Sequence, residues 1–318
     1  MMDLRQLNAL VAVADHGTFS AAADALSTVQ SNVSAHVAHL ERELGVVLVD
    51  RGAGRLTEEG EAVVARARRV QGEIEALVAD LSALRDEVAG TARLGLIGTT
   101  ARWLVPRLLS TVAQRHPRLH LEAVEGNTTL LEPLLVAGRL DLAVLQGTVA
   151  GSDLVLTPLF TEDLVLVVPA DHPLADQGPL DPALLAGLGL LLPVKGTAFR
   201  NEIDAALEPL GITLSPRAEL DGVRLIASLT FEGLGPAILP ATAVPGYLRE
   251  QFSLVQVKGM PRRRIGVALP RRGRPSAPAR AVISLLDEVV ADTSSIPEGL
   301  HAAPRLEGSS SGRHPGQG

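Results

Sequence analysis

The sequence predicts a multidomain α+β protein, in which a small helical unit is joined by one long helix to two α/β lobes. Three observations lead to this fold class. Residues 1–57 contain short helical patterns separated by turns, residues 58–88 carry one unbroken apolar repeat, and strands alternate with helices from residue 91 onward. At about 100–200 residues per domain, the 318 residues suffice for two or three domains that each bury a core.

The N-terminal unit contains three short predicted helices. Apolar residues between positions 4 and 14 follow helical spacing, and His16-Gly17 ends this first helix. Ser20 is a suitable N-cap for an alanine-rich second helix, and the short segment 27–29 leads into the third helix, which Gly45 ends. Because alanine is small, the second and third helices can cross closely, as in a helix-turn-helix.

The long helix carries a heptad repeat over residues 58–88. Its apolar residues are spaced alternately by four and by three positions, which is the pattern of a coiled-coil seam, and charged residues flank them. We therefore expect a dimerising helix; the alternative is a helix that packs on its own domain. The predicted dimerisation residues are Val63, Ala67, Val70, Ile74, Leu77, Leu81, Leu84 and Val88.

Beyond Gly90-Thr91 the alternation of strands and helices predicts parallel sheets covered by helices on both faces. A final strand and helix would return to the first unit, so that lobe 1 comprises about 91–165 plus 266–292 and lobe 2 about 166–265. Residues 293–318 are poor in apolar side chains and predict a disordered tail. The expected strands are 93–97, 119–124, 140–145, 164–168, 189–192, 217–220, 237–239 and 264–269, with helices over 103–116, 129–137, 199–210, 224–231 and 277–292.

The composition excludes several classes of function. None of the 318 residues is cysteine, which rules out disulfides, thiolate zinc ligands and thiol redox sensing. The N-terminus has no basic segment followed by an apolar stretch, and the chain has no uncharged apolar run of about 18 residues. We therefore expect a cytoplasmic protein with neither a signal peptide nor a membrane partner.

The sequence resembles the LysR-type transcriptional regulators over residues 1–292. No single dipeptide carries the resemblance; the ordered string of matching residues does. In the N-terminal unit this string contains Asp3–Leu7, Gly17–Ala23, Leu26, Gln30-Ser31, Val33-Ser34, Leu40-Glu41, Glu43–Gly45, Leu48, Arg51, Leu56-Thr57 and Gly60. Weaker similarity continues through Leu104–Leu109, Gly138–Val144 and Phe231–Pro240.

The resemblance implies a winged helix-turn-helix DNA-binding domain over 1–57, a linker or dimerisation helix over 58–89 and an effector-binding domain over 90–292, whose two lobes resemble type 2 periplasmic binding proteins. It implies a transcriptional regulator that binds double-stranded promoter DNA as a homodimer or homotetramer, with RNA polymerase as a further candidate partner. A small-molecule effector bound between the lobes would modulate DNA binding or bending. We expect no cofactor and no metal, because His36 and His39 lie one helical turn apart but lack a third ligand.

The residues expected to touch DNA lie at the start of the third helix and in the wing. Gln and Asn side chains can pair with adenine, and Ser can reach phosphates. Residues 1–57 contain four arginines against six carboxylates, a net charge of −2, and the wing is short for the family. We therefore expect weak non-specific binding with a shallow salt dependence. The predicted contacts are Gln30, Ser31, Asn32, Ser34, Ala35, His36, Arg51, Arg55 and Thr57.

The residues expected to touch the effector follow the strands of both lobes. Hydroxyls and backbone N–H groups at helix N-termini suit a carboxylate or phosphate, and Lys195 would add a positive charge, so we expect a small anionic organic effector. The alternative is that the threonines are simply N-caps. The predicted set is Thr99, Thr100, Asn127, Thr128, Gln146, Lys195, Gly196, Thr197 and Phe199, with Thr129 beside it.

Two other classes of function are weighed against this interpretation. An enzyme is disfavoured because the chain has no P-loop and no His-Glu-x-x-His motif, and Gly233-Leu234-Gly235 lacks the third glycine of a dinucleotide-binding fingerprint. A transported-solute-binding protein would fit the lobes alone but not the added N-terminal helices. The arginines at 262–264, 271, 272 and 274 are interpreted as a solvated rim of lobe 1 and not as a second DNA-binding surface.

Overall fold

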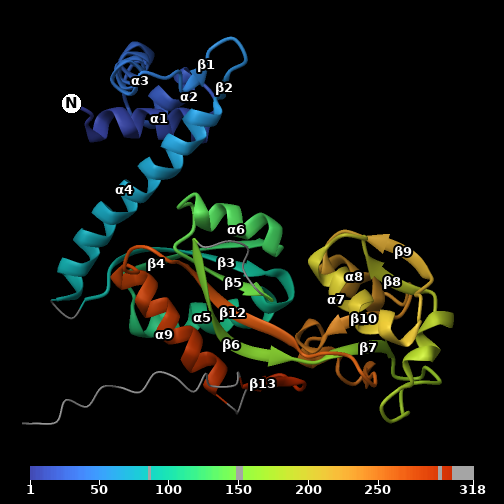
Figure 1. Ribbon diagram of the computed structural model, residues 1–318. Coiled ribbons are helices and arrows are strands. Elements are labelled where there is room, and N and C mark those ends of the chain that lie inside the picture. Colours follow the sequence, from blue (N-terminus) through green and yellow to red (C-terminus); the bar gives the residue numbers. More distant parts are fainter. Residues whose placement is uncertain (85–86, 148–152, 293–295, 303–318) are drawn as a thin grey trace, which may run out of the picture.

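The computed structural model describes residues 1–84, 87–147, 153–292 and 296–302. The N-terminal unit stands apart from the two lobes, and helix α4 (Glu58–Ala83) connects it to the first of them (Figure 1). The N-terminal unit and each lobe have hydrophobic cores of their own, and the second lobe has one on each face of its sheet.

Three helices and a two-stranded wing form the N-terminal unit. Its core is built from leucine, valine and alanine, with Leu10, Val37 and Leu40 at 0% exposure. A Cβ at Gly60 would lie 2.0 Å from the Leu48 carbonyl oxygen, so only glycine lets α4 begin this close to the wing. The elements are α1 (Leu4–His16), α2 (Phe19–Ala25), α3 (Gln30–Leu44), β1 (Val49–Asp50) and β2 (Arg55–Leu56).

The cap of the second helix differs from the prediction. Thr18 accepts a hydrogen bond from the Ala21 backbone N–H at 3.1 Å, whereas Ser20 lies inside α2. The choice of Ser20 was wrong because a capping hydroxyl must reach the third N–H of the helix, and only Thr18 stands at that distance. Asp3 caps α1 in the same way and forms a capping box with Gln6.

Helix α4 divides its apolar residues between two environments. Val63 packs against the N-terminal core and Ala67 is buried in it, so these two predicted seam residues are engaged within their own chain. The helix ends at Ala83. Val88 was predicted to extend the seam, and this was wrong, because it packs against the core of lobe 1. The remaining seam residues are exposed: Val70 41%, Ile74 41%, Leu77 61%, Leu81 57% and Leu84 82%.

Lobe 1 is built on a six-stranded mixed sheet of order β13-β6-β12-β5-β3-β4. Only β3, β4 and β5 are mutually parallel, while β12, β6 and β13 pair antiparallel, so the expected parallel sheet is confirmed for three strands. The elements are β3 (Gly90–Ile97), α5 (Gly98–Arg115), β4 (Leu119–Gly126), α6 (Thr128–Val136), β5 (Leu142–Gln146), β6 (Leu154–Glu162), β12 (Arg263–Pro270), α9 (Ala277–Ala291) and β13 (Leu300–Ala302).

Lobe 2 is built on a five-stranded sheet of order β11-β7-β10-β8-β9. Helix α7 packs against one face and α8 against the other. Strands β6 and β11 were not predicted. The elements are β7 (Leu164–Pro169), η1 (Pro182–Gly187), β8 (Leu190–Pro193), α7 (Ala198–Leu207), η2 (Glu208–Leu210), β9 (Pro216–Leu220), α8 (Val223–Phe231), β10 (Ala237–Pro240), η3 (Ala241–Ala243), η4 (Gly246–Leu248) and β11 (Phe252–Gln256).

Two chain crossings join the lobes, one from β6 into β7 and one from β11 into β12, as the sequence predicted. The second crossing reaches lobe 1 at Arg263, slightly before the expected position 266. The expected disordered tail is contradicted at residues 300–302, because β13 pairs with the edge of β6 and buries Leu300. Residues 293–295 and 303–318 lie outside the described part of the chain. Among the described helices, none is long and apolar enough to cross a membrane.

Candidate functional site

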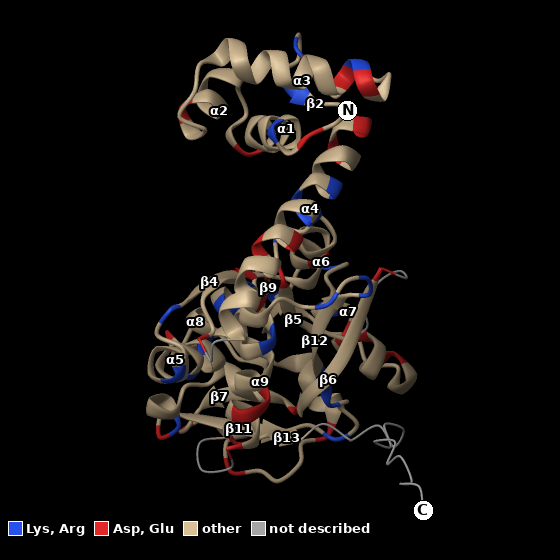
Figure 2. Cartoon of the chain, turned by 90° about the vertical axis from the view of Figure 1, so that its left-hand side faces the viewer, with Lys and Arg blue, Asp and Glu red and all other residues tan. Residues whose placement is uncertain are grey.

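The N-terminal half of α3 presents polar side chains on an exposed surface. Gln30, Ser31, Asn32 and Ala35 are exposed, and Ser34 and His36 are half-buried; the apolar residues Val33, Val37 and Leu40 face the core instead. Figure 2 shows that α2 and the first part of α3 are almost free of basic residues. The six predicted residues of this helix therefore form one accessible and nearly uncharged face.

Arg51 connects the wing to this face. Its Nη1 donates a hydrogen bond to the Ser34 hydroxyl at 3.2 Å, and its guanidinium lies 5.3 Å from the centre of the Phe19 ring. Its Nη2 lies 3.8 Å from a carboxylate oxygen of Glu41. Arg51 is thus held beside α3, so its charge lies at the edge of the predicted base-reading surface.

The other two wing residues differ from each other. Arg55 is exposed on β2 and is free to reach a phosphate. The Thr57 hydroxyl donates to the Val47 carbonyl at 2.7 Å and accepts from the Gly60 backbone N–H at 3.0 Å. Thr57 therefore serves as the cap of α4, and its role as a DNA contact stays a prediction.

A buried arginine lies at the junction of the lobes. Arg263, 3% exposed on β12, donates to the Glu162 carboxylate at 3.1 Å and to the Thr99 hydroxyl at 3.3 Å. It also donates to the Gln146 side-chain oxygen, and its guanidinium lies 5.0 Å from the centre of the Phe199 ring. Three residues of the predicted effector set, from β5, α5 and α7, thus converge on Arg263.

Sequence reasoning missed the site role of Arg263 because the residue lies in the run Arg262-Arg263-Arg264, which was interpreted as a solvated rim. One signal in the sequence could have identified Arg263. Side chains alternate between the two faces of a strand, so the middle arginine of the three must point to the opposite face from its neighbours. Glu162 was missed too; it is completely buried (0%), and the Thr242 hydroxyl donates to its second oxygen at 2.5 Å.

Side-chain bridges hold the two lobes together. The Gln146 amide of lobe 1 donates to the Glu202 carboxylate on α7, and Arg224 of α8 pairs with Glu125 at the end of β4. Arg102 donates to the Tyr247 hydroxyl at 2.8 Å. All three bridges run from lobe 1 to lobe 2, and we call this arrangement, with the lobes in side-chain contact, closed.

The junction has no excess of positive charge. Its bridging carboxylates belong to Glu125, Glu162 and Glu202, and they face the guanidiniums of Arg224 and Arg263. Burial raises the pKa of Glu202, and the nearby positive charge of Arg263 partly opposes that rise. No cation of this network is left without a counter-charge, so the junction has little electrostatic preference for an anion.

The remaining predicted effector residues, all within the described part of the chain, do not hydrogen-bond to Arg263, and Thr100 among them is fully buried. Asn127 accepts from the Leu130 backbone N–H at 2.9 Å, and Thr197 accepts from the Arg200 N–H at 3.3 Å. Both are N-caps, which confirms the alternative interpretation for Thr197 only. Thr128 is the first residue of α6 and half-buried, and Lys195 and Gly196 are exposed, so these three do not join the Arg263 network.

Four buried side-chain polar atoms lack a hydrogen-bond partner among the described residues, and one of them belongs to Arg263. They are Thr100 Oγ1, Trp103 Nε1, Thr230 Oγ1 and Arg263 Nε. Thr100 and Trp103 lie on α5 and Thr230 lies on α8, the two helices that pack across the lobes. Since buried polar groups are almost always satisfied in native proteins, these atoms mark a site suited to a polar ligand or to water.

Comparison with known proteins matches two parts of the chain to family models. Residues 4–61 match the family model described as "Bacterial regulatory helix-turn-helix protein, lysR family", and residues 85–291 match that of the "LysR substrate binding domain". A probable hydrogen peroxide-inducible genes activator of Streptomyces viridosporus is 37% identical, over 76% of this chain and 78% of that protein. The DNA-binding transcriptional dual regulator OxyR of Escherichia coli K12 is 30% identical, over 91% of this chain and 95% of that protein.

A solved structure is similar over nearly the whole length. The full-length OxyR of Pseudomonas aeruginosa, carrying a cysteine-to-aspartate substitution, superposes with a TM-score of 0.73 at 27% identity, covering 91% of this chain and 98% of that one. The likeness extends over the N-terminal unit, the connecting helix and both lobes.

Proposed function

The chain belongs to the LysR family of bacterial transcription regulators, and from that premise we propose that its closed pair of lobes responds to a reversibly bound small molecule and not to oxidation of a thiol. The chain is a DNA-binding transcriptional regulator with an effector-binding domain, and it is not an enzyme. Since one relative is named as a probable hydrogen peroxide-inducible genes activator, the question is whether this chain also responds to peroxide.

One observation carries the proposal: none of the 318 residues is cysteine, and the only sulfur atoms belong to three methionines. Sulfenic acids and disulfides both form from a thiolate, which this chain lacks. A peroxide signal therefore has no thiol to act on. The unsatisfied Nε of the buried Arg263 and the side-chain bridges between the lobes support a ligand that enters the junction and replaces these bridges with its own contacts.

The proposed ligand acts through its different affinity for open and closed lobes, since only a differential affinity shifts such an equilibrium. Lobe 1 is tied to the linker helix by the Arg93–Glu75 pair at 3.1 Å and by the Arg280–Asp80 pair at 3.1 Å. Lobe movement would therefore reorient α4 and, with it, the paired DNA-binding units of a homodimer or homotetramer. We propose that this reorientation changes DNA bending at the promoter.

The test compares two treatments of the full-length chain on the DNA upstream of its own gene. We expect hydrogen peroxide to leave the footprint unchanged, and a low-molecular-mass extract of the host cell to change it until dialysis restores it. The variant Met2→Leu/Met260→Leu controls for oxidation of the methionines that follow the first residue. A footprint that peroxide alters, and that stays altered after dialysis and in this variant, would contradict the proposal.

The nearly uncharged face of α3 leads to a prediction about salt. If Arg51 and Arg55 supply the main phosphate contacts of each DNA-binding unit, a dimer neutralises about four phosphates and the slope of log K against log salt is about −4 or shallower. A gel-shift titration of the operator complex between low and physiological salt measures this slope. A value as steep as about −8 would show that other cations make the contacts.

A further inference from the structure

We propose that a pocket between the linker helix and lobe 1 is a second ligand site, which takes an organic anion with an apolar body. The pocket has a volume of about 680 Å³ and lies between α4 on one side and β3, the α6–β5 turn and the β12–α9 loop on the other. Small-molecule sites are typically about 300–1,000 Å³, so the pocket has room for a drug-sized ligand.

The floor of the pocket is apolar. Val78 and Ala79 of α4, which are not seam residues, line it at 61% and 6% exposure, and Leu135 and Leu140 of lobe 1 lie on its opposite side. Such side chains in a concave site favour a hydrocarbon or aromatic group, because its burial removes apolar surface from water.

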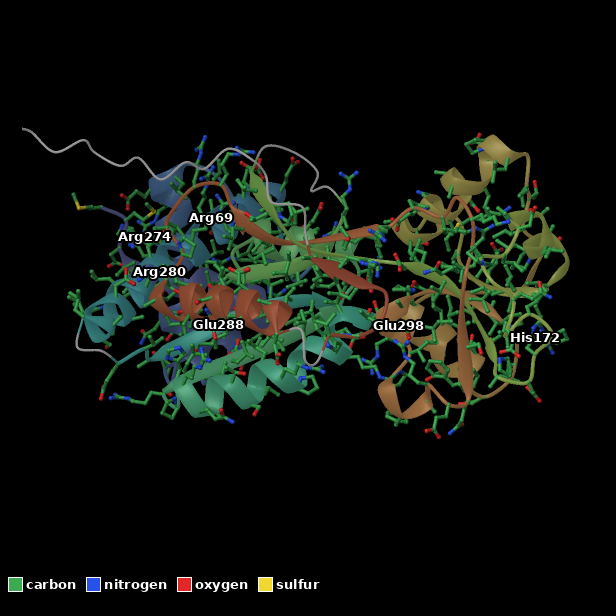
Figure 3. The ribbon with its side chains drawn as sticks, turned by 90° about the horizontal axis from the view of Figure 1, so that it is seen from below. Arg69, His172, Arg274, Arg280, Glu288 and Glu298 are labelled. Carbon is green, nitrogen blue, oxygen red and sulfur yellow. The ribbon has the colours of Figure 1, made fainter. Side chains whose placement is uncertain are left out.

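The wall of the pocket is rich in arginine. Six arginines and four carboxylates line it, a net charge of +2 in a chain whose net charge is −7. The arginines are Arg66, Arg68, Arg69, Arg93, Arg272 and Arg274, and the carboxylates are Glu73, Glu75, Asp141 and Asp153. Figure 3 labels two of them, Arg69 of α4 and Arg274 of the β12–α9 loop.

Half of these arginines are already engaged. Arg68 pairs with Asp15 at 2.5 Å, Arg69 donates to the Val136 carbonyl at 2.6 Å, and Arg93 pairs with Glu75. By contrast, Arg272 and Arg274 are exposed and have no ion pair with any described residue, and the same holds for Arg66 on the facing helix.

Arg272 and Arg274 are separated by a single residue in the β12–α9 loop that closes the pocket. Guanidinium groups bind carboxylates, sulfonates and phosphates through paired charge-assisted hydrogen bonds. We therefore assign the anion-binding character that the sequence suggested for the lobe junction to this pocket, since both guanidiniums of the junction already face carboxylates. The pocket shares no residue with the Arg263 network.

The position of the pocket gives its ligand a regulatory role. Its walls belong to both the helix that carries the DNA-binding unit and the lobe that carries the junction, so an occupant would fix the angle between them. This role is independent of the junction ligand, and either site can be present without the other.

The probe for this site is 8-anilinonaphthalene-1-sulfonate, which joins an aromatic body to one anionic group and fluoresces when it is bound in an apolar site. We expect saturable binding of one probe per chain of the full-length protein, with displacement by decanoate but not by decanol. The variant Arg272→Glu/Arg274→Glu should weaken probe binding by at least roughly tenfold, because two charge-assisted hydrogen bonds are lost. The matched control Arg217→Glu/Lys258→Glu makes the same charge change at exposed positions of lobe 2 and should bind the probe as the parent does.

Two results would overturn the proposal. One is equal probe affinity in Arg272→Glu/Arg274→Glu and in the parent chain. The other is probe binding that occurs only when the chain is made monomeric by Leu77→Asp/Leu81→Asp, which would mean that a second copy covers the pocket. Neither result bears on the junction ligand, because the footprint response to the cell extract is measured separately and should persist in Arg272→Glu/Arg274→Glu.

Discussion

Replacing Glu162 by alanine is expected to destabilise the effector domain by about 3–5 kcal/mol, because Arg263 then keeps a buried charge without a partner. Glu162 is 0% exposed and Arg263 is 3% exposed, so neither water nor a surface counter-ion can substitute. The Thr242 hydroxyl loses its acceptor in the same variant. At about 2–4 °C per kcal/mol for a domain of this size, the melting temperature should fall by about 6–20 °C.

Calorimetry of the full-length chain measures this change as a shift of the effector-domain transition. The matched control is Glu298→Ala, which removes the partner of Arg249 from a pair whose glutamate side chain is 85% exposed and should cost less than about 1 kcal/mol. The double variant Glu162→Leu/Arg263→Met removes both charges and should recover most of the loss. Equal shifts for Glu162→Ala and Glu298→Ala would show that the buried pair does not contribute as argued.

The second large effect concerns the linker helix. Leu77→Asp/Leu81→Asp places two charges among side chains that are 57–61% exposed and that no described residue of the same chain covers. Monomeric proteins rarely expose an apolar surface of this length, and a heptad seam is buried by a second helix. We expect the variant to be monomeric in light scattering.

Loss of the dimer should also weaken operator binding. Two linked DNA-binding units exceed the affinity of one by about 10²–10⁴-fold, and the monomer loses this gain. A gel shift on the operator measures the change. The control Leu77→Met/Leu81→Met keeps the positions apolar and similar in volume, so it should stay dimeric and bind DNA normally. A dimer that survives both aspartates would place the interface elsewhere.

Local patterns predicted the N-terminal unit and most elements of the lobes. The spacing of Val33, Val37 and Leu40 sets the buried face of α3, and Gly45 ends that helix with φ at +72°. The two chain crossings followed from the return of the last strand and helix to the first lobe. Each of these features depends on residues that are near in sequence, or on an ordered string of them.

Local patterns failed where a residue meets a distant partner. Val88 has the heptad spacing but packs against the core of lobe 1. Strand β13 forms because the edge of β6 accepts it, although its three residues are too few to predict a strand and lie in a segment poor in apolar side chains. In each case a tertiary contact overrides a correct local pattern.

By itself, the sequence determined the order of the helices and of most strands, the family and the absence of a thiol, because periodicity, capping residues and composition are properties of neighbouring positions or of the whole chain. Only the tertiary structure decided which charges are free. Arg263 is neutralised by Glu162, 101 residues away, while Arg272 and Arg274 close a pocket against a helix that begins more than two hundred residues earlier. The free energy of a buried charge depends on the partner that the fold brings to it, and three arginines in a row give no sign of which one that will be.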